Sequence, residues 1–353
     1  MFGFFKTAKP RRIQFESDGQ AHQTIEVSDK ETILSAALRQ GIPFPHSCRV
    51  GGCATCKCQL REGKVKELTE SAYVLSEQEL DQGYILACQS VPRTDLTIRL
   101  EQAQVPGPSP GAQTLCGRVT DQRRLTHDIS ALRLRLEQPL RYAAGQYALL
   151  SVPGIVDEAR SYSFATPSTR SGRSDVEFFI RQVPGGAMSG WAQGATPGTP
   201  ISLQGPFGDF YLREGQQPIL CIAGGSGLAP LKALLEDALQ QHNSRPVVLL
   251  FGARTQADLY CLEELAHLQQ HWAGDFTFVP VLSEEPSSSP WGGQRGLVTD
   301  VLAQHTRPNA QAYLCGPPAM VDAAEAQLQA LGVPAEQIFS DKFLDKSSLV
   351  HSA

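Results

Sequence analysis

The spacing of four cysteines constrains this chain more than any other feature. Cys48, Cys53 and Cys56 are separated by four and then by two residues, and Cys88 follows after a longer gap. This is the ligand spacing of a plant-type [2Fe–2S] cluster, in which four thiolates hold two irons. One tight loop then supplies three thiolates and a neighbouring strand supplies the fourth. A pair of glycines inside the loop allows the backbone to curl closely around the inorganic sulfurs.

Two other uses of these cysteines fit the sequence less well. Structural zinc sites usually combine two short pairs of the C-x₂-C kind, and Cys88 has no such partner nearby. Disulfides are disfavoured because nine cysteines is an odd number and we see no secretory signal at the start of the sequence. Cys58 follows Cys56 by two residues, and we expect it to be a packed thiol on a strand rather than a ligand. The remaining cysteines are scattered, and most of them are expected to be small buried residues.

The segment around the cysteines, residues 10–103, is expected to form a β-grasp ferredoxin domain. Short alternating strands and two helices with N-cap signals make up its pattern. In chain order they are strands at 13–15 and 24–27, a helix capped by Ser28 or Asp29, a helix that opens with a capping box at 76–79, and strands at 84–88 and 96–100. Residues 104–113 are rich in proline and glycine, which predicts a semi-rigid linker.

Residues 114–214 are expected to form an antiparallel β-barrel, because short alternating strands are separated by Gly/Pro turns. Arg160, Tyr162 and Ser163 share one of these strands. Their side chains suit a phosphate, a flavin ring and its reactive nitrogen. About twenty-five residues later, Gly185 and Gly186 open a short helix with a serine in its first turn. Backbone N–H groups at the start of a helix attract anions, so both motifs indicate a flavin nucleotide.

Residues 215–353 change to an alternation of apolar strands and helices, which predicts a parallel sheet. A strand that ends in Gly224–Gly227 and leads into a helix is typical of a pyrophosphate-binding loop, although the spacing differs from G-x-G-x-x-G. A helix is expected at 257–271. Cofactors bind beyond the carboxyl ends of parallel strands, and these ends are expected at 224–227, 252–254, 283–285 and 315–318.

Taken together, these motifs follow one another in an order that resembles the ferredoxin–NADH reductase components of bacterial oxygenases. The family includes the reductases of benzoate dioxygenase, phenol hydroxylase and soluble methane monooxygenase. Four stretches are most similar to its xylene monooxygenase branch: 185–191, 251–254, 259–262 and 280–285. The resemblance implies a multidomain α+β protein with a ferredoxin-NADP reductase-like fold behind the cluster domain.

The resemblance also implies a reaction and its cofactors. NADH would give a hydride to FAD, and the electrons would pass singly through the [2Fe–2S] cluster to an oxygenase. Ser163 and Cys315 are the residues expected beside the reacting atoms. The residues expected to hold FAD are Arg160, Tyr162, Ser163, Gly185, Gly186, Met188, Ser189 and Phe343. Those expected to hold the dinucleotide are Gly224, Gly225, Ser226, Gly227, Arg254, Glu284, Gly316 and Pro317.

The third strand of the nucleotide domain bears on the choice between NADH and NADPH. It ends in Ser283, Glu284 and Glu285, and two carboxylates would repel a 2′-phosphate while suiting ribose hydroxyls. Arg254, in the neighbouring loop, is the opposing feature because a guanidinium can pair with that phosphate. We expect NADH to be preferred.

The expected partner is a terminal hydroxylase, by resemblance an integral-membrane di-iron enzyme of the xylene monooxygenase type. The alternative is a soluble aromatic-ring dioxygenase or a phenol hydroxylase-type monooxygenase. One rival function is a redox sensor without a downstream enzyme. The other is a flavin reductase, or an oxygen-dependent enzyme in its own right, that needs no partner. A net charge of −5 gives no case for nucleic-acid binding. We expect a cytoplasmic monomer whose aromatic and basic N-terminus gives at most a weak peripheral membrane contact.

Overall fold

The computed structural model describes residues 10–17, 20–42, 44–46, 51, 56–69, 71–100 and 112–343. These residues form two compact units, with the boundary between residues 107 and 108. Two of the four expected cluster ligands, Cys48 and Cys53, lie outside the described residues, as does most of the expected linker.

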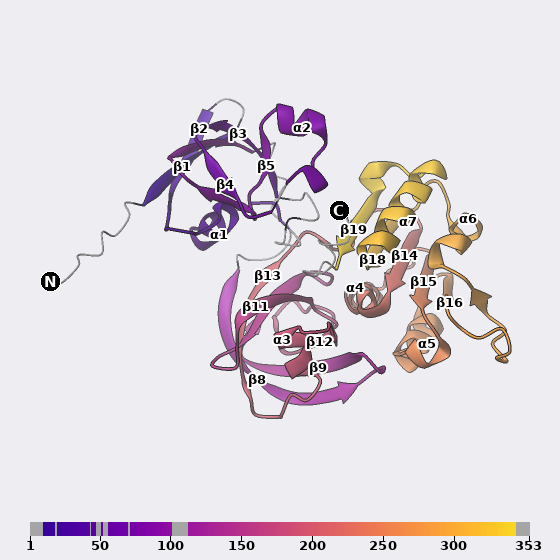
Figure 1. Ribbon diagram of the computed structural model, residues 1–353. Helices are drawn as coiled ribbons and strands as arrows, with labels where there is room; N and C mark the ends of the chain where they lie inside the picture. The colour runs from indigo at the N-terminus through magenta and orange to yellow at the C-terminus, as the bar shows by residue number, and fades with distance from the viewer. Residues whose placement is uncertain are drawn as a thin grey trace. The chain divides into compact units, whose positions relative to one another are not determined.

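The first unit, drawn in indigo and violet in Figure 1, is built on a mixed sheet. Its strand order is β2-β1-β7-β3-β5. Its strands are β1 (Arg11–Ser17), β2 (Gln20–Val27), β3 (Lys57–Glu62), β5 (Tyr84–Leu86) and β7 (Leu96–Arg99). β7 runs parallel to β1, and the other neighbours are antiparallel. A separate antiparallel pair joins β4 (Val65–Glu67) to β6 (Ser90–Pro92). This arrangement is the expected β-grasp.

Helix α1 (Ile33–Arg39) covers this sheet with an apolar face that includes Ile33, Leu34 and Ala37. The helix begins later than the sequence suggests. Its N-cap is Thr32, whose side chain accepts the Ser35 N–H at 3.2 Å, so the prediction of Ser28 or Asp29 is wrong. Lys30 has a φ of 63°, and this left-handed residue prevents a helix from starting before it. The capping box at the start of α2 (Glu77–Asp81) is confirmed.

The second unit begins with an antiparallel sheet in the order β11-β10-β13-β8-β9-β12. The strands are β8 (Gln113–Arg124), β9 (Ile129–Leu140), β10 (Tyr147–Val152), β11 (Val156–Ser163), β12 (Arg173–Arg181) and β13 (Pro200–Phe207). A bridge between Phe164 and Phe178 joins the two outer strands, so the sheet closes into the expected barrel. Leu132, Leu134 and Leu136 point into its core, which confirms the predicted alternation on β9.

The rest of the unit is a parallel sheet in the order β17-β16-β15-β14-β18-β19. Its strands are β14 (Ile219–Gly224), β15 (Val247–Ala253), β16 (Phe276–Leu282), β17 (Gln294–Arg295), β18 (Gln311–Gly316) and β19 (Ile338–Lys342). The strand order reverses at β14, which lies between β15 and β18. Ligands of doubly wound sheets bind at such a switch point.

Helices cover both faces of the parallel sheet (Figure 1). α4 (Leu228–Gln240) and α5 (Leu262–His271) share one core with barrel residues such as Ile129 and Phe179. α6 (Leu302–His305) and α7 (Pro318–Ala330) pack on the other face. α5 begins five residues after the predicted start at 257, because Cys261 has a left-handed φ of 56°. Among the described helices, none is long and apolar enough to cross a membrane.

Candidate functional site

Two of the expected cluster ligands come together from distant segments. Cys56 precedes β3, and Cys88 lies in the turn between β5 and β6. The Cys88 N–H donates to the Cys56 Sγ at 3.5 Å, and the Gln89 side-chain amide lies 3.7 Å from the Cys88 Sγ. N–H donors of this kind tune the potential of an iron–sulfur cluster. Cys88 is predicted on a strand, but β5 ends at Leu86 because the Gln89 N–H turns back to the Leu86 carbonyl at 2.9 Å.

The surroundings of these two thiols fit a tightly wrapped cluster. Gly51 has a φ of +88°, and a Cβ there would lie 2.7 Å from Gln89 Cγ and 3.0 Å from Thr69 Oγ1. Only glycine fits this close approach. Cys58, by contrast, is fully buried in the core of the first unit. Burial raises the pKa of the Cys58 thiol, so its neutral form is favoured.

The two flavin motifs of the barrel lie together. Arg160, Tyr162 and Ser163 are on β11, and the short helix α3 (Ala187–Ala192) packs against β11 and β12. Gly185 has a φ of +71°, and a Cβ there would meet no described atom within 4 Å. Open space beside a glycine turn fits the close approach of a phosphate.

The side chains of Met188 and Ser189 point into the protein rather than out of it. Met188 is buried in the barrel core. Ser189 Oγ accepts the Val183 N–H at 3.0 Å and is likewise buried. Their side chains therefore hold the turn in shape, which leaves backbone groups as their means of contact with a cofactor.

The glycines of the β14 loop have separate structural reasons. A Cβ on Gly227 would lie 2.1 Å from the Cys315 carbonyl oxygen, and one on Gly224 would lie 2.5 Å from Met320 Sδ. Gly225 has open space around its Cα and a φ of +54°. The loop is thus pressed against the end of β18 on one side and open on the other, as a pyrophosphate cradle requires.

A cavity of about 330 Å³ lies at this carboxyl edge of the sheet. Barrel and sheet both contribute to its lining. The barrel residues are Thr126, Asp128, Ile129 and Arg181, and the sheet-edge residues include Gly224, Gly225, Arg254, Ser283, Pro317 and Met320. The expected carboxyl-edge location of the dinucleotide site thus coincides with a real cavity.

Ser163 and Cys315, the two residues expected beside the reacting atoms, are brought close by Asp341. The Ser163 hydroxyl donates to Asp341 Oδ2 at 3.3 Å, and Asp341 is the strand partner of Cys315 on β19. All three side chains are buried. Burial, with the nearby Asp341 carboxylate, raises the pKa of the Cys315 thiol, so a neutral thiol is favoured. Phe343 follows this strand, and its N–H donates to the Gly316 carbonyl at 2.9 Å.

Tyr260 connects the cavity to the barrel. Its hydroxyl donates to the Gly225 carbonyl at 2.8 Å, and its ring meets Phe179 of β12 edge-on at 5.5 Å. Burial raises the pKa of Tyr260, so the phenol remains a donor. The glycine loop is thereby positioned by a side chain that also packs on the barrel.

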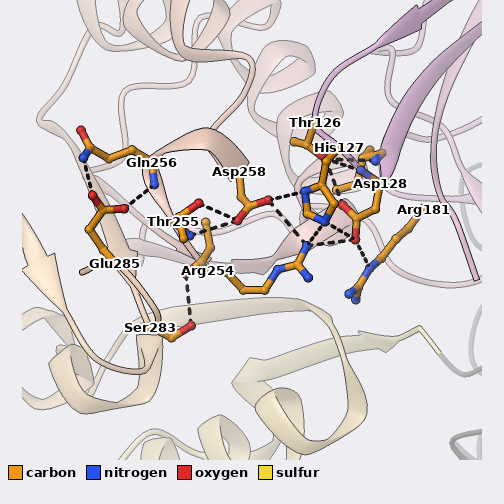
Figure 2. A network of polar contacts seen from close by, with 12 residues as sticks. Thr126, His127, Asp128, Arg181, Arg254, Thr255, Gln256, Asp258, Ser283 and Glu285 are labelled. Atoms are coloured by element: carbon orange, nitrogen blue, oxygen red, sulfur yellow. Dashed lines mark hydrogen bonds and ion pairs between the residues drawn. The ribbon is translucent and has the colours of Figure 1, made fainter. Parts of the chain in front are cut away.

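A polar network crosses from the barrel to the sheet at the cavity wall (Figure 2). Asp128 Oδ2 accepts Arg181 Nε and Arg254 Nη2, each at 3.0 Å. His127 Nδ1 lies 3.0 Å from Asp258 Oδ1. Burial opposes ionisation of Asp128, but hydrogen bonds from Arg181 and Thr126 and the charge of Arg254 outweigh it and lower the pKa of Asp128. The carboxylate is therefore charged at neutral pH.

Three family models match the chain in series. A 2Fe-2S iron-sulfur cluster binding domain matches residues 15–93, an oxidoreductase FAD-binding domain residues 117–211 and an oxidoreductase NAD-binding domain residues 221–326. The expected cofactor classes and their order along the chain are confirmed.

A curated relative spans almost all of the sequence. The xylene/toluene monooxygenase electron transfer component of Pseudomonas putida is 43% identical over 334 residues, which cover 93% of each chain. The chain belongs to the reductase components of bacterial oxygenases. The resemblance drawn from the sequence motifs is thereby confirmed. The propane 2-monooxygenase reductase component of Mycolicibacterium smegmatis, another similar protein, is 40% identical over 90% of this reductase and 94% of its own length.

Solved structures extend the likeness to the whole fold. The cytochrome P450 reductase of Amycolatopsis has a TM-score of 0.80 and 34% identity, over 94% of this chain and 98% of its own. The ferredoxin reductase of carbazole 1,9a-dioxygenase has a TM-score of 0.75 and 30% identity, over 96% of this chain and 100% of its own. The expected fold class is confirmed. The first structure is a cytochrome P450 reductase and the second belongs to a dioxygenase, so this fold occurs with different kinds of oxygenase.

Three residues at the site escape sequence reasoning. Asp341 and Asp128 lie on segments without a motif, and Tyr260 belongs to the stretch 259–262, which resembles the family but carries no motif of its own. Their roles depend on contacts with Ser163, Arg254 and Gly225 that join segments far apart in the chain. No local spacing signals such contacts.

Proposed function

We propose that the chain is a ferredoxin–NAD(+) reductase that oxidises NADH and delivers electrons to the terminal hydroxylase of a multicomponent oxygenase. When bound, FAD accepts a hydride, and the [2Fe–2S] cluster carries the electrons onward one at a time. The residues of the chain bind these groups, orient them and exclude water.

The observation that carries the proposal is the contact between the flavin strand and the coenzyme edge of the sheet. Ser163 on β11 reaches Asp341 on β19 at 3.3 Å, and both barrel and sheet line the cavity. Hydride transfer needs two rings held in contact in a site without water. The contact joins β11, which suits a flavin, to the carboxyl edge of the parallel sheet, which suits a dinucleotide. This arrangement fits the requirement for two rings in contact.

For the flavin, Arg160 would pair with phosphate, Tyr162 would lie along the ring system, and the Gly185–Gly186 turn would approach the pyrophosphate. Ser163 would hydrogen-bond near the reactive nitrogen. Asp341 keeps the Ser163 hydroxyl pointing one way, which makes Asp341 a positioning residue. Phe343 would cover the flavin from the carboxyl-terminal side.

For the dinucleotide, the Gly224–Gly227 loop would receive the pyrophosphate. Gly316 and Pro317 would border the nicotinamide end, and Cys315, as a neutral thiol, would lie near the nicotinamide. Glu284 would accept hydrogen bonds from ribose hydroxyls, and it is exposed at the end of β16. For the cluster, Cys48, Cys53, Cys56 and Cys88 would be the four ligands.

The first experiment tests the electron path. The full-length protein with both cofactors is mixed with NADH, and flavin bleaching, cluster bleaching and ferricyanide reduction are followed. We expect fast bleaching of both chromophores and little NADH oxidation by oxygen alone. Bleaching of the flavin without the cluster would contradict the relay, and rapid oxidation by oxygen alone would favour a flavin reductase that needs no partner.

The proposed partner is an integral-membrane di-iron hydroxylase of the xylene monooxygenase type. The 43% identity to the xylene/toluene component exceeds the 36% to the phenol 2-monooxygenase component and the 35% to that of toluate 1,2-dioxygenase. Product formation is measured with each type of terminal component in turn. Turnover with a soluble dioxygenase or phenol hydroxylase component alone would replace this partner by the alternative.

The proposal also includes NADH rather than NADPH as the donor. Two carboxylates, Glu284 and Glu285, follow β16. The Gln256 N–H and its side chain, at 2.9 and 2.5 Å, hold Glu285 and lower its pKa, so it is ionised at neutral pH. The measurement is kcat/KM for both coenzymes, and equal values would contradict the preference.

We further propose a cytoplasmic monomer that meets the membrane mainly through its hydroxylase. The first five residues include three phenylalanines, and Lys6 and Lys9 follow, all outside the described residues. Each basic residue near anionic lipid adds about 1 kcal/mol. Because β1 begins at Arg11, a version lacking residues 1–9 leaves the sheet intact. Co-sedimentation of both versions with anionic vesicles measures how much residues 1–9 add to membrane binding, and equal binding would exclude such a contribution. Sedimentation velocity tests whether the protein is a monomer.

A further inference from the structure

Arg254 is the cation best placed to change the coenzyme preference of this reductase. It follows β15, and its carbonyl accepts the Glu284 N–H at 2.8 Å. Its backbone is therefore joined to the segment where the ribose is proposed to bind. Among the described residues that line the cavity, the cations are Arg181 and Arg254.

One carboxylate binds both of these guanidiniums. Asp128 Oδ2 lies 3.0 Å from Arg181 Nε and 3.0 Å from Arg254 Nη2 (Figure 2). Asp128 is itself held by its own loop, because Thr126 Oγ1 donates to its Oδ1 at 3.0 Å. Asp258 adds a second carboxylate 3.5 Å from Arg254 Nη2. Asp128 belongs to the barrel, so the flavin domain supplies this contact to the coenzyme domain.

A divalent cation is a less suitable occupant of the same cluster. His127, Asp128 and Asp258 offer ligand atoms within 4.8 Å of one another. Two guanidiniums already neutralise the two carboxylates, and a further cation would be repelled by Arg254 and Arg181. The network is therefore complete in charge without a metal.

We propose that Asp128 determines coenzyme specificity by keeping Arg254 engaged, so that a 2′-phosphate finds no available cation in the cavity. The proposal rests on the proposed function, since it concerns the same dinucleotide site. A 2′-phosphate would have to displace Asp128 from Arg254 while being repelled by Asp128, Asp258 and Glu284. An unphosphorylated ribose has to do neither.

Equilibrium binding of two probes to the full-length holoprotein tests this directly. Adenosine 2′,5′-bisphosphate carries the extra phosphate, and 5′-AMP lacks it. Calorimetry gives both Kd values, and their ratio measures the preference. Asp128→Asn keeps the shape of the side chain and removes its charge. We expect the ratio to move toward the bisphosphate by about tenfold or more, as for one gained charge-assisted hydrogen bond.

Two further variants show whether the effect passes through Arg254. Arg254→Gln alone should leave the ratio of the two Kd values unchanged. When Asp128→Asn is added to Arg254→Gln, the relative affinity for the bisphosphate should not increase. Asp175→Asn is the matched control, because Asp175 also pairs with an arginine of the barrel, Arg135, but away from the cavity lining. It should leave the ratio unchanged. Asp128→Ser serves as a second neutral variant should the asparagine disturb folding.

The outcomes separate this inference from the proposed function. A wild-type protein that binds NADH and 5′-AMP, with a ratio that Asp128→Asn and Asp128→Ser leave unmoved, overturns the role of Asp128 only. A gain that persists with Arg254→Gln also overturns it. A wild-type protein that binds neither 5′-AMP nor NADH overturns the dinucleotide site itself. The kcat/KM ratio of NADPH to NADH should rise in parallel with the binding ratio.

Discussion

At the scale of single residues, the surroundings of each thiol in the cluster domain indicate whether it is a cluster ligand or a packed core residue. Cys56 and Cys88 sit where N–H groups meet their sulfurs, whereas Cys58 faces an apolar core. We predict that Cys88→Ser loses or strongly alters the reduced-state EPR signal, and that Cys58→Ser keeps it. Iron content and EPR of the two variants are measured together. A normal signal in the first, or none in the second, would contradict the ligand set.

A second prediction at this scale concerns Asp341. Asp341→Ala leaves the buried Ser163 hydroxyl without its acceptor, and the reorientation of that hydroxyl should slow flavin reduction about tenfold. FAD content and KM for NADH should hardly change, because neither depends on this contact. Asp341→Asn, which can still accept, should recover part of the rate. Stopped-flow reduction rates decide the matter, and loss of FAD instead of rate would indicate a purely structural role.

At the scale of elements, the loop after β14 requires a glycine at position 227, because the backbone of Cys315 lies where a Cβ would be. Gly227→Ala would place its Cβ 2.1 Å from the Cys315 carbonyl oxygen, and backbone atoms cannot move aside cheaply. We predict a loss of about 1–3 kcal/mol in the free energy of unfolding. Gly190→Ala in α3 is the control, since no described atom lies within 4 Å of its added Cβ. It should be neutral or gain about 0.5–1 kcal/mol from helix propensity. Urea denaturation of the two variants compares them.

Helix α2 provides a prediction about pH. Lys57 Nζ lies 2.5 Å from Glu79 Oε1, and this contact, with the Ser76 N–H and hydroxyl, lowers the pKa of Glu79 from 4.5 to about 2. Because the folded pKa is the lower one, the stabilisation is present above pH 4.5 and is lost as the pH falls toward 2.

Glu79→Gln should therefore be less stable than wild type near neutral pH, and the difference should shrink in acid. Urea midpoints from about pH 7 to about pH 3.5, read by far-UV circular dichroism, measure the difference. A gap that stays constant across this range would show that the carboxylate charge contributes nothing.

At the scale of the whole molecule, the hydrophobic cores of the barrel and of the parallel-sheet domain are both formed by residues of the second unit. The barrel has its own apolar core, and α4 and α5 share another with barrel residues. We predict that a chain starting at residue 108 folds, binds FAD and reduces ferricyanide with NADH, yet drives no oxygenase. Loss of flavin or of ferricyanide activity would show that the proposed separation at 104–113 is wrong.

The sequence by itself determined the class of the protein, because its strongest signals are local. The cysteine spacing, the Gly224–Gly227 loop and the alternating leucines of β9 each depend on neighbours within a few residues. Local geometry dictates such patterns, so they predicted the cluster domain, the barrel, the parallel sheet and the cofactor classes. Helix starts were less predictable, since the left-handed residues Lys30 and Cys261 delay α1 and α5 without a clear signal.

Only the tertiary structure decided how the site is assembled. Arg254 reads in the sequence as an available cation, but folding brings Asp128 to it across more than a hundred residues. Asp341 reaches Ser163 in the same way, from the last described strand. The side chains of Met188 and Ser189 point inward because Met188 packs in the barrel core and Ser189 Oγ accepts the Val183 N–H. Charge pairing and burial act through space, so their partners are fixed by the fold and not by the spacing of residues along the chain.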